Sequence, residues 1–586
     1  MRFLGNVLAT IVGLFVFLMM FFFGIVLIAA IFGGDSEEIS VKSESVIELK
    51  LENIVNDYAG KYKDPWVTIL SDGEKVGLSD IIIAIEAAKT DKDIKGISIL
   101  NNVSELGMAQ SKALRDALED FKKSGKFVMA YSNSYSQKEY YLNSVANSIY
   151  INPVGDFDFK GMSAELMFFK DLQEKSGIKM EVIRHGKYKS AVEPFLDNKM
   201  SDDNREQISE LLTSVWSSVL DDISKSRKIS TAKLNEIANG LLARTPEMAK
   251  AQKLVDIIAY EDVYHDAIRK KLKVDKDEDY NKINILDYAQ KVATTSKSAD
   301  SQDKIAVIYA QGEIMGGEGD INTIGEGSMN RSLIEARKDE NVKAIVLRID
   351  SPGGSALTSD LIWREIELTK KVKPVVVSMG NYAASGGYYI ACNANKIFAE
   401  KNTITGSIGV FGIVPNFTPL ATKIGIHTEQ VKTNDNAAEY SPFLPMDEKF
   451  KTVTLEGVEQ VYKTFVSHVA AGRKMTVAQV DSIGQGRVWS GEQALKVGLV
   501  DKIGGLDDAI KEAAILAKTK SYTMQNFPEY EKDMNDIFKN FPFAKSKESF
   551  IKEELGEETF RLMEQFKKVQ ARKGVQAMLP FEMVIH

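Results

Sequence analysis

A serine set among small residues is the first feature of the sequence that points to chemistry. Ser385 stands in the stretch AASGG, after the β-branched run 374–378, which is typical of a buried parallel strand and ends by Gly380. A helix-like segment follows, through Cys392. At the start of such a helix a serine exposes its hydroxyl where backbone N–H groups favour a developing anion. The pattern differs from a strict G-x-S-x-G because Ala383 occupies the first glycine position.

A second glycine-rich turn, SPGG at 351–354, follows another apolar run at 344–349. Backbone N–H groups at two such strand ends can form an oxyanion hole, which stabilises the negative charge on a carbonyl oxygen under attack. The two turns therefore indicate acyl transfer, with Ser385 as the nucleophile. The alternative interpretation is a pair of ordinary glycine turns at the carboxyl edge of a parallel sheet.

A serine hydroxyl is a weak nucleophile at neutral pH and needs a base to take its proton. Lys189, in the stretch HGKYKSAVEPF, is the candidate, because a lysine can act as a base when burial lowers its pKa. Its neighbours Ala191, Val192 and Phe195 are apolar and favour partial desolvation. His185 is the alternative base, and an ordinary exposed lysine is the alternative interpretation of Lys189. The five histidines, none of them in a glycine motif, are His185, His265, His427, His468 and His586.

The chain contains two copies of one sequence pattern, displaced by 248 residues. The segment DKDIKGISIL at 91–100 aligns with DENVKAIVLR at 339–348. The same offset pairs Tyr140-Tyr141 with Tyr388-Tyr389, Ala146-Asn147 with Ala394-Asn395, Gly177-Ile178 with Gly425-Ile426, and Pro194-Phe195 with Pro442-Phe443. Repetition over this length predicts a tandem of two related domains, 46–272 and 304–520.

The two copies differ where chemistry is expected. Ser385 corresponds to Gln137, and the SPGG turn corresponds to VSEL at 103–106. Conversely, Lys189 corresponds to Ala437. One copy offers a serine without a lysine and the other a lysine without a serine, which favours a single site shared between the copies. The alternative is independent divergence of two surfaces.

Apolar strand-like runs alternate with helix-like segments in each copy. The strands expected are 46–51, 94–100 and 127–131 in the first copy and 305–309, 344–349 and 374–378 in the second, with helical spacing at 106–123 and 359–371. This alternation predicts an α/β fold of βαβ units with largely parallel sheets. Residues 273–303, charged and rich in Ser and Thr, are expected to link the copies. Residues 521–586 match neither copy and are expected to form a helical tail, with an amphipathic segment at 548–571 and an apolar end.

The net charge and the cysteine content argue against several classes of function. The net charge of −8 argues against nucleic-acid binding as the main function. Cys392 is the single cysteine, so an intrachain disulfide and a cysteine-rich metal site are excluded. The chemistry expected of Ser385 and Lys189 requires no metal and no cofactor.

The segment 1–34 is expected to be a membrane anchor. No charged residue occurs from 3 to 34, and 7–32 is almost wholly apolar, which is long enough to span a bilayer as a helix. A cleaved signal peptide has a shorter apolar core and a small-residue cleavage site. Arg2 precedes the segment, whereas Asp35, Glu37 and Glu38 follow it. The positive-inside bias therefore places the N-terminus in the cytoplasm and the rest of the chain outside.

Four motifs together resemble one known family. YKSAVEPF, MGNYAASGGYY, SPGG and TGSIGVFG, in a duplicated chain behind an N-terminal anchor, resemble the long, two-repeat form of the signal peptide peptidase A (protease IV) family. The resemblance covers 46–520 and the anchor. It implies tandem domains of the Clp protease/crotonase superfamily and a Ser–Lys peptidase, with Ser385 as the nucleophile and Lys189 as the general base.

The resemblance also implies further roles and partners. Ser407, in TGSIG, would help to hold the lysine. The backbone N–H groups of Gly353 and Gly386 would form the oxyanion hole, with Gly354 as an alternative donor. The family assembles as a homotetramer at the bacterial inner membrane, with its catalytic domains on the periplasmic side. Its substrates are cleaved signal peptides and other apolar peptides.

Two other functions stay open at this point. A crotonase-like enzyme would use the glycine turns to bind the thioester oxyanion of an acyl-coenzyme A, and binding of such a thioester would favour it. A membrane scaffold of duplicated oligomerisation domains would need no catalysis, and a Ser385→Ala variant with full cellular function would favour it.

Overall fold

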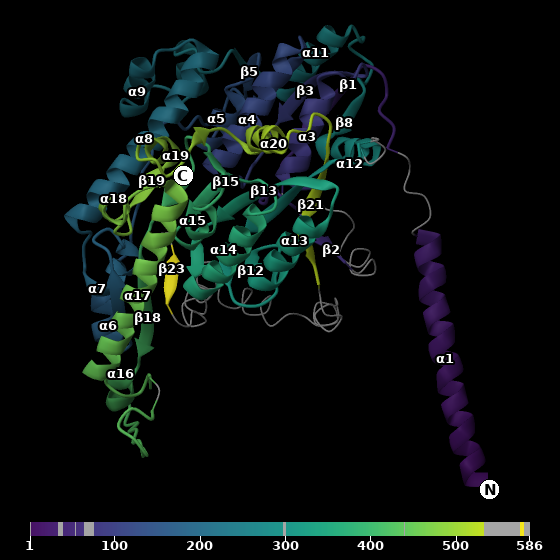
Figure 1. The fold of residues 1–586 in the computed structure, drawn as a ribbon. Helices are drawn as coiled ribbons and strands as arrows, with labels where there is room; N and C mark the ends of the chain where they lie inside the picture. The colour runs from purple at the N-terminus through teal and green to yellow at the C-terminus, as the bar shows by residue number, and fades with distance from the viewer. Residues whose placement is uncertain are drawn as a thin grey trace.

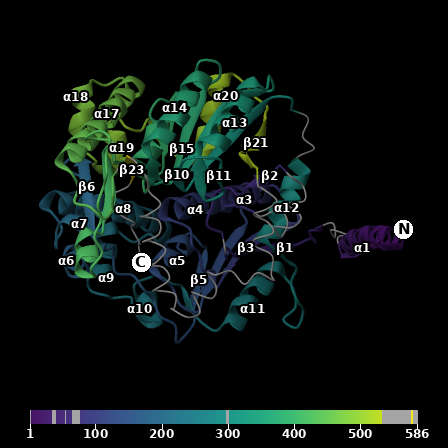
Figure 2. The same ribbon diagram turned by 90° about the horizontal axis from the view of Figure 1, so that it is seen from below.

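The computed structural model describes residues 2–32, 39–52, 54–63, 76–296, 301–438, 440–531 and 575–578. Its first helix, α1 (Arg2–Phe32), stands apart from the body of the molecule in both views (Figures 1 and 2). The predicted anchor, 1–34, also includes residues 1, 33 and 34, which lie outside the described residues. Within the described part of the chain, no helix combines the length and the hydropathy needed to cross a membrane. The anchor stays a prediction.

The first half of the chain forms a parallel sheet of β1 (Ser45–Leu49), β3 (Ile94–Leu100), β4 (Phe127–Ser132), β5 (Ser148–Ile151), β7 (Ile257–Ile258) and β8 (Lys282–Asn284). The strand order is β7-β5-β4-β3-β1-β8. Its principal helices are α3 (Leu78–Ala88), α4 (Met108–Lys123), α5 (Gln137–Asn143), α8 (Asp202–Arg227), α9 (Thr231–Asn239), α10 (Pro246–Ala251), α11 (Glu261–Leu272) and α12 (Ile285–Ser296). In α4, for example, Leu114, Leu118 and Phe121 recur at helical spacing and are fully buried in the core.

The second half repeats this architecture. Its sheet contains β9 (Lys304–Gln311), β13 (Val342–Ser351), β15 (Val375–Ala384), β16 (Lys396–Ala399), β17 (Ile404–Gly406), β19 (Val488–Ser490), β20 (Lys502–Ile503) and β21 (Thr523–Phe527). The helices of this half are α13 (Glu326–Lys338), α14 (Ala356–Lys370), α15 (Gly386–Ala391), α16 (Thr418–Lys423), α17 (Glu448–Arg473), α18 (Val477–Ile483), α19 (Gly491–Lys496) and α20 (Leu506–Ala517). All the pairings within the sheet are parallel except that of β17 with β19.

The two halves share a strand order and individual hydrogen bonds. The order β7-β5-β4-β3-β1 in the first sheet matches β20-β16-β15-β13-β9 in the second. Tyr140 Oη donates to the Leu254 carbonyl oxygen at 3.0 Å, and Tyr388 Oη donates to the Leu499 carbonyl oxygen at 2.8 Å. Each tyrosine is buried, so its hydroxyl needs such a partner. The structure therefore has the internal duplication that the sequence offset predicts.

A third, mixed sheet joins the halves. It contains β6 (Lys179–His185), β10 (Glu313–Met315), β11 (Gly319–Asp320), β12 (Thr323–Gly325), β14 (Gly353–Ser355), β18 (Val410–Asn416) and β23 (Gln576–Met578). Its strand order is β11-β12-β10-β14-β23-β18-β6. β6, from the first half, pairs antiparallel with β18, from the second, over the full length of both strands. After β6 the chain continues through the short helices η1 (Ser190–Val192) and α7 (Glu193–Leu196), beside α6 (Lys170–Ser176).

The structure departs from the expected elements in three places. β15 continues to Ala384 instead of ending by Gly380, because β17 pairs with its last residues after β16 has ended. The expected connection, 273–303, includes β8 and α12, which complete the first sheet and pack on it. In the expected helical tail, 521–586, the elements among the described residues are strands: β21, β22 (Glu529–Tyr530), which pairs with β2 (Lys61–Tyr62), and β23. The amphipathic segment predicted at 548–571 lies outside the described residues.

Candidate active site

Ser385 lies at the junction of β15 and α15, where the backbone is strained. Its φ of +53° falls in the left-handed region, which side-chain-bearing residues rarely adopt. The Ser385 N–H donates to the Gly406 carbonyl oxygen at 2.8 Å, and the Ser385 carbonyl accepts from the Tyr389 N–H of α15 at 2.8 Å. These bonds fix the sharp turn from strand to helix. The side chain is completely buried beneath the surface.

Lys189 reaches Ser385 from the other half of the chain. Its Nζ lies 2.9 Å from Ser385 Oγ, and the side chain has no exposed surface. Two glycines of the second half make room for it. A Cβ on Gly486, whose φ is +81°, would lie 2.6 Å from Lys189 N, and a Cβ on Gly409 would lie 3.2 Å from Lys189 Cδ. Each repeat supplies the residue that the other lacks, and the fold brings this lysine and this serine into contact.

Ser407 is the second hydroxyl at the lysine. Lys189 Nζ lies 3.0 Å from Ser407 Oγ and 3.3 Å from the Ser407 carbonyl oxygen. The carbonyl oxygen of Met578, in β23, also accepts from this amine. These partners are all uncharged, and burial holds the pKa of Lys189 well below its usual value of 10.5. A neutral amine has one lone pair, so at this position it can accept the proton of a hydroxyl.

The glycines of the SPGG turn lie against the same site. Gly353 has a φ of +100°, which favours glycine, and a Cβ built on it would lie 2.8 Å from the Gly386 nitrogen. The predicted donors Gly353 and Gly386 are therefore neighbours. Gly354, the alternative donor, has a φ of +154°, and a Cβ on it would lie 2.1 Å from the Ile314 carbonyl oxygen of β10, on which it packs. The Gly386 nitrogen thus lies against Gly353, whose own N–H donates to Ser351 Oγ at 3.2 Å.

Asp350 ties the SPGG turn to the strand that leads to Ser385. Its Oδ1 accepts from the Tyr382 N–H at 2.9 Å, and its Oδ2 accepts from Asn381 Nδ2 at 3.0 Å. Burial, with a smaller contribution from Asp57, raises the pKa of Asp350 to about 7. Since Asp350 immediately precedes the turn, this carboxyl group couples the position of Gly353 to that of β15.

The same strands are fastened to the first half of the chain. Asn381 Oδ1 accepts from the N–H groups of Ala109 and Gln110 at the start of α4, each at 3.1 Å. Arg348 Nε donates to Asp57 Oδ2 at 2.6 Å, and both side chains are almost completely buried. Removing either partner would leave the other charge buried and unpaired, which destabilises the fold. The relative placement of Lys189 and Ser385 therefore depends on contacts remote from either residue.

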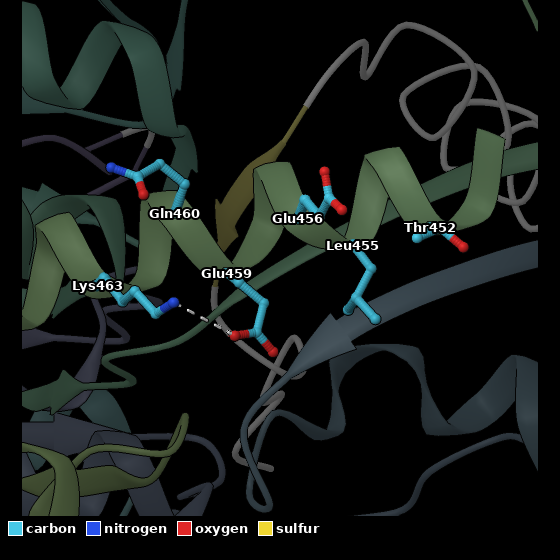
Figure 3. Close-up of a pocket in the computed structure, with 6 residues that line it drawn as sticks. All are labelled: Thr452, Leu455, Glu456, Glu459, Gln460 and Lys463. Atoms are coloured by element: carbon cyan, nitrogen blue, oxygen red, sulfur yellow. Dashed lines mark ion pairs between the residues drawn. The ribbon is translucent and has the colours of Figure 1, made fainter. Parts of the chain in front are cut away.

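His185, the alternative base, points elsewhere. Its Nδ1 lies 3.3 Å from Glu459 Oε1, and its ring centroid lies 4.0 Å from that of Tyr462, both on α17. Glu459 belongs to a shallow hollow along α17, where it also pairs with Lys463 (Figure 3). The hollow is lined by Thr452, Leu455, Glu456, Glu459, Gln460 and Lys463, and none of these six is a predicted site residue.

Sequence reasoning missed several residues of the site, although some left a signal. Gly486 and Gly409 are glycines that stand in loops of the second copy, yet nothing local connects them with Lys189. Asn381 lies inside the motif MGNYAASGG, but nothing in the sequence indicates its contact with α4. In the ranges that the structure describes, no group of three or more His, Cys, Asp or Glu side chains is placed to hold a metal ion.

The chain is similar in sequence to proteins that are described as peptidases or proteases. The family model described as Peptidase family S49 matches residues 120–275 and 367–520, one match in each half. Protease 4 of Salmonella typhi is 39% identical over 460 residues, which covers 77% of this chain and 74% of the relative. Serine protease SPPA, chloroplastic, of Arabidopsis thaliana is 34% identical over 464 residues, with 77% and 68% covered. A putative signal peptide peptidase SppA of Enterococcus faecium is 34% identical over 259 residues, with 43% and 74% covered.

Proposed function

Because the chain belongs to peptidase family S49 and is a serine peptidase, we propose that Ser385 is its nucleophile and that Lys189, from the other repeat, is its general base. One observation carries this proposal. The fully buried Lys189 amine lies 2.9 Å from Ser385 Oγ, and burial among uncharged partners lowers its pKa, which favours the neutral form that can accept the hydroxyl proton.

The reaction follows from this geometry. Ser385 Oγ attacks the peptide carbonyl carbon while Lys189 Nζ takes the hydroxyl proton. The N–H groups of Gly353 and Gly386 stabilise the oxyanion that forms. The lysine then gives the proton to the leaving amine, and the serine ester remains as an acyl-enzyme. Lys189 next activates a water molecule, whose attack on the ester releases the second product and restores the serine. Ser407 Oγ holds the amine in line throughout.

The substrates are apolar peptides, foremost the remnants of cleaved signal peptides. The name of the Enterococcus faecium relative points to this class, and an extended peptide can bind by adding a strand to a sheet. The segment 1–34 anchors the protein in the bacterial inner membrane, with the N-terminus in the cytoplasm and the peptidase on the periplasmic side. Four copies assemble at the membrane. Protease treatment of intact spheroplasts tests this topology, since digestion of the catalytic domains from the outside is expected.

The decisive experiment compares variants on a fluorogenic, apolar peptide in detergent. Ser385→Ala and Lys189→Ala are each expected to lower kcat by a factor of about 1,000 or more. His185→Ala is the matched control and is expected to keep the activity of the parent, because its ring contacts α17. Substantial activity in Lys189→Ala would refute the base assignment. Membership in a peptidase family disfavours the acyl-coenzyme A and scaffold alternatives, and turnover of a coenzyme A thioester in place of peptides would reinstate the first of them.

A further inference from the structure

Lys189 lies on an irregular stretch of chain that a loop of the other half holds in place. β6 ends before the lysine and η1 begins directly after it, so Lys189 itself belongs to no regular element. The N–H of Tyr188 donates to the Gln485 carbonyl oxygen at 2.8 Å. This bond joins the lysine segment to the loop 484–487, whose Gly486 packs against the lysine backbone.

Arg487 ends this loop, and its guanidinium group contacts the residue that precedes the lysine. Its Cζ lies 4.8 Å from the centre of the Tyr188 ring and 4.6 Å from the centre of the Trp489 ring, so the cation lies over both aromatic rings. Its Nη1 also donates to Tyr188 Oη at 3.1 Å. A lysine could not reproduce these contacts, because it lacks the plane and the fixed fork of donors.

Two carboxylates of α8 surround the same guanidinium group. Nη1 donates to Glu206 Oε1 at 3.2 Å, and Nη2 donates to Glu210 Oε2 at 2.5 Å. These glutamates are one turn apart on α8, a helix of the first half that lies against β19 of the second (Figure 1). The Arg487 side chain is only 14% exposed, whereas both glutamates are about half exposed. Such pairs contribute little stability by themselves, but they fix the direction of the guanidinium group.

The backbone of Arg487 holds the second hydroxyl at the lysine. Its carbonyl oxygen accepts from the Ser407 N–H at 2.7 Å. Ser407 has a φ of +50°, which a residue with a side chain rarely adopts, so this bond supports a strained conformation. Arg487 therefore contacts the neighbour of Lys189 through its side chain, and through its backbone the residue whose oxygens lie near the lysine amine.

The first copy has no arginine at the corresponding position. At the spacing that pairs Arg473 with Arg227, Arg487 corresponds to Leu241, which is 49% exposed. The fold of a repeat therefore does not require an arginine at this place. It occurs in the copy whose loop receives the lysine of the other copy, which favours a role in the site.

We propose that Arg487 is a positioning residue that holds the Lys189 segment and Ser407 in one arrangement, so that the lysine amine stays within reach of Ser385 Oγ. The proposal rests on the proposed function, because it takes Lys189 as the general base. Without the guanidinium group, Tyr188 is released and water can reach the lysine. A misplacement of about 1 Å can cost about a hundredfold in rate, so Arg487→Ala should lower kcat by a factor of about 10 to 100 with KM nearly unchanged.

Two kinetic readouts distinguish positioning from a merely structural role. In Arg487→Ala the rise of kcat with pH should move to higher pH, since a hydrated amine holds its proton more firmly than a buried one. Added guanidinium ion, well below the concentration that unfolds the parent, should recover part of the lost kcat, because it can bind between the Tyr188 and Trp489 rings.

Arg487→Lys is the second variant. It keeps a positive charge beside Glu206 and Glu210, but it should still lower kcat, because lysine lacks the planar fork. The matched control is Arg244→Ala, at an exposed position in the corresponding loop of the first copy, where Nη1 donates to the Leu241 carbonyl oxygen at 3.1 Å. This control should keep the kcat and the pH profile of the parent. All variants are made in the full chain, and their thermal unfolding is compared with that of the parent.

A labelling measurement does not depend on catalysis. In the Ser385→Ala protein, with and without Arg487→Ala, the rate at which an acylating reagent modifies the Lys189 amine is followed by mass spectrometry. The amine has no exposed surface, so it reacts only when its segment opens. Removing the guanidinium group should raise this rate about tenfold or more.

The outcomes separate this proposal from the proposed function. If Lys189→Ala is inactive while Arg487→Ala or Arg487→Lys keeps the kcat of the parent, the positioning role is wrong and the catalytic assignment stands. An unchanged labelling rate overturns the positioning role even if kcat falls. If Lys189→Ala is active, the base assignment fails, and faster labelling in Arg487→Ala would still uphold the positioning role.

Discussion

Replacing Lys189 with methionine should change how the stability of the protein depends on pH. The amine is fully buried, and burial holds its pKa well below the usual 10.5. In the unfolded chain the lysine is in water and titrates near that usual value. Between the two pKa values the unfolded chain therefore binds one more proton at this side chain than the folded protein does. Methionine has a similar length and no proton to bind.

The magnitude follows from proton linkage. Where the unfolded state holds one extra proton, the free energy of unfolding rises with pH by about 1.4 kcal/mol per pH unit. Lys189 alone should therefore add about 1.4 kcal/mol of stability for each pH unit between its lowered pKa in the folded protein and about pH 9.5. The contribution levels off above 10.5, where the unfolded lysine has also lost its proton. Lys189→Met should lack this part of the rise.

The assay is urea unfolding in detergent, followed by circular dichroism at several pH values in this window. All proteins carry Ser385→Ala, so that proteolysis cannot interfere. Lys199→Met, at an exposed position, is the matched control and should keep the slope of the parent. Because only the change of stability with pH is compared, a constant packing difference between lysine and methionine cancels. Equal slopes for Lys189→Met and its parent would show that the buried amine keeps its proton, and the general-base mechanism would fail.

Three further substitutions test the surroundings of the site. Ser407→Ala removes the hydroxyl 3.0 Å from Lys189 Nζ and should lower kcat about tenfold with little change in KM; an unchanged kcat in the peptide assay would exclude the orienting role. Gly353→Ala forces a methyl group to within 2.2 Å of the Ala577 carbonyl oxygen, at a residue whose φ is +100°. The substitution should lower kcat about a hundredfold while the circular dichroism spectrum stays that of the parent. Parental activity would show that Gly353 is not part of the oxyanion hole. Asn381→Ala leaves two N–H groups of α4 without their acceptor and should lower the free energy of unfolding by about 1–2 kcal/mol in urea titrations; parental stability would mean that this link is dispensable.

The sequence predicted the parts of the fold that depend on local pattern. The strands at 94–100 and 127–131 appear as β3 and β4, because buried parallel strands are continuous apolar runs. The duplication and the family resemblance are confirmed by family matches in both halves. The contact between Lys189 and Ser385 was also predictable, since each residue is missing from the other copy at the equivalent position.

The parts of the fold and the site that could not be predicted from the sequence depend on pairings between distant segments. β6 and β18 pair across more than two hundred residues, and no local pattern specifies that register. β23 has three residues, too few for a periodicity to be read, and its strand conformation is imposed by β14 and β18. Gly486 lies in none of the four motifs, and although Gly409 lies in TGSIGVFG, the role of both glycines becomes visible only when Lys189 is placed beside them.

The residues that surround Lys189 determine when the site can form during synthesis of the chain. The lysine belongs to the first repeat, but Gly409 and Gly486, which line its seat, are added to the growing chain much later. While only the first repeat has been made, Lys189 has neither Ser385 nor these two glycines beside it. On the proposed assignment, catalysis therefore requires the second repeat to fold against the first. The division of the proposed pair between the two repeats thus keeps the first repeat inactive on its own until the second has been made.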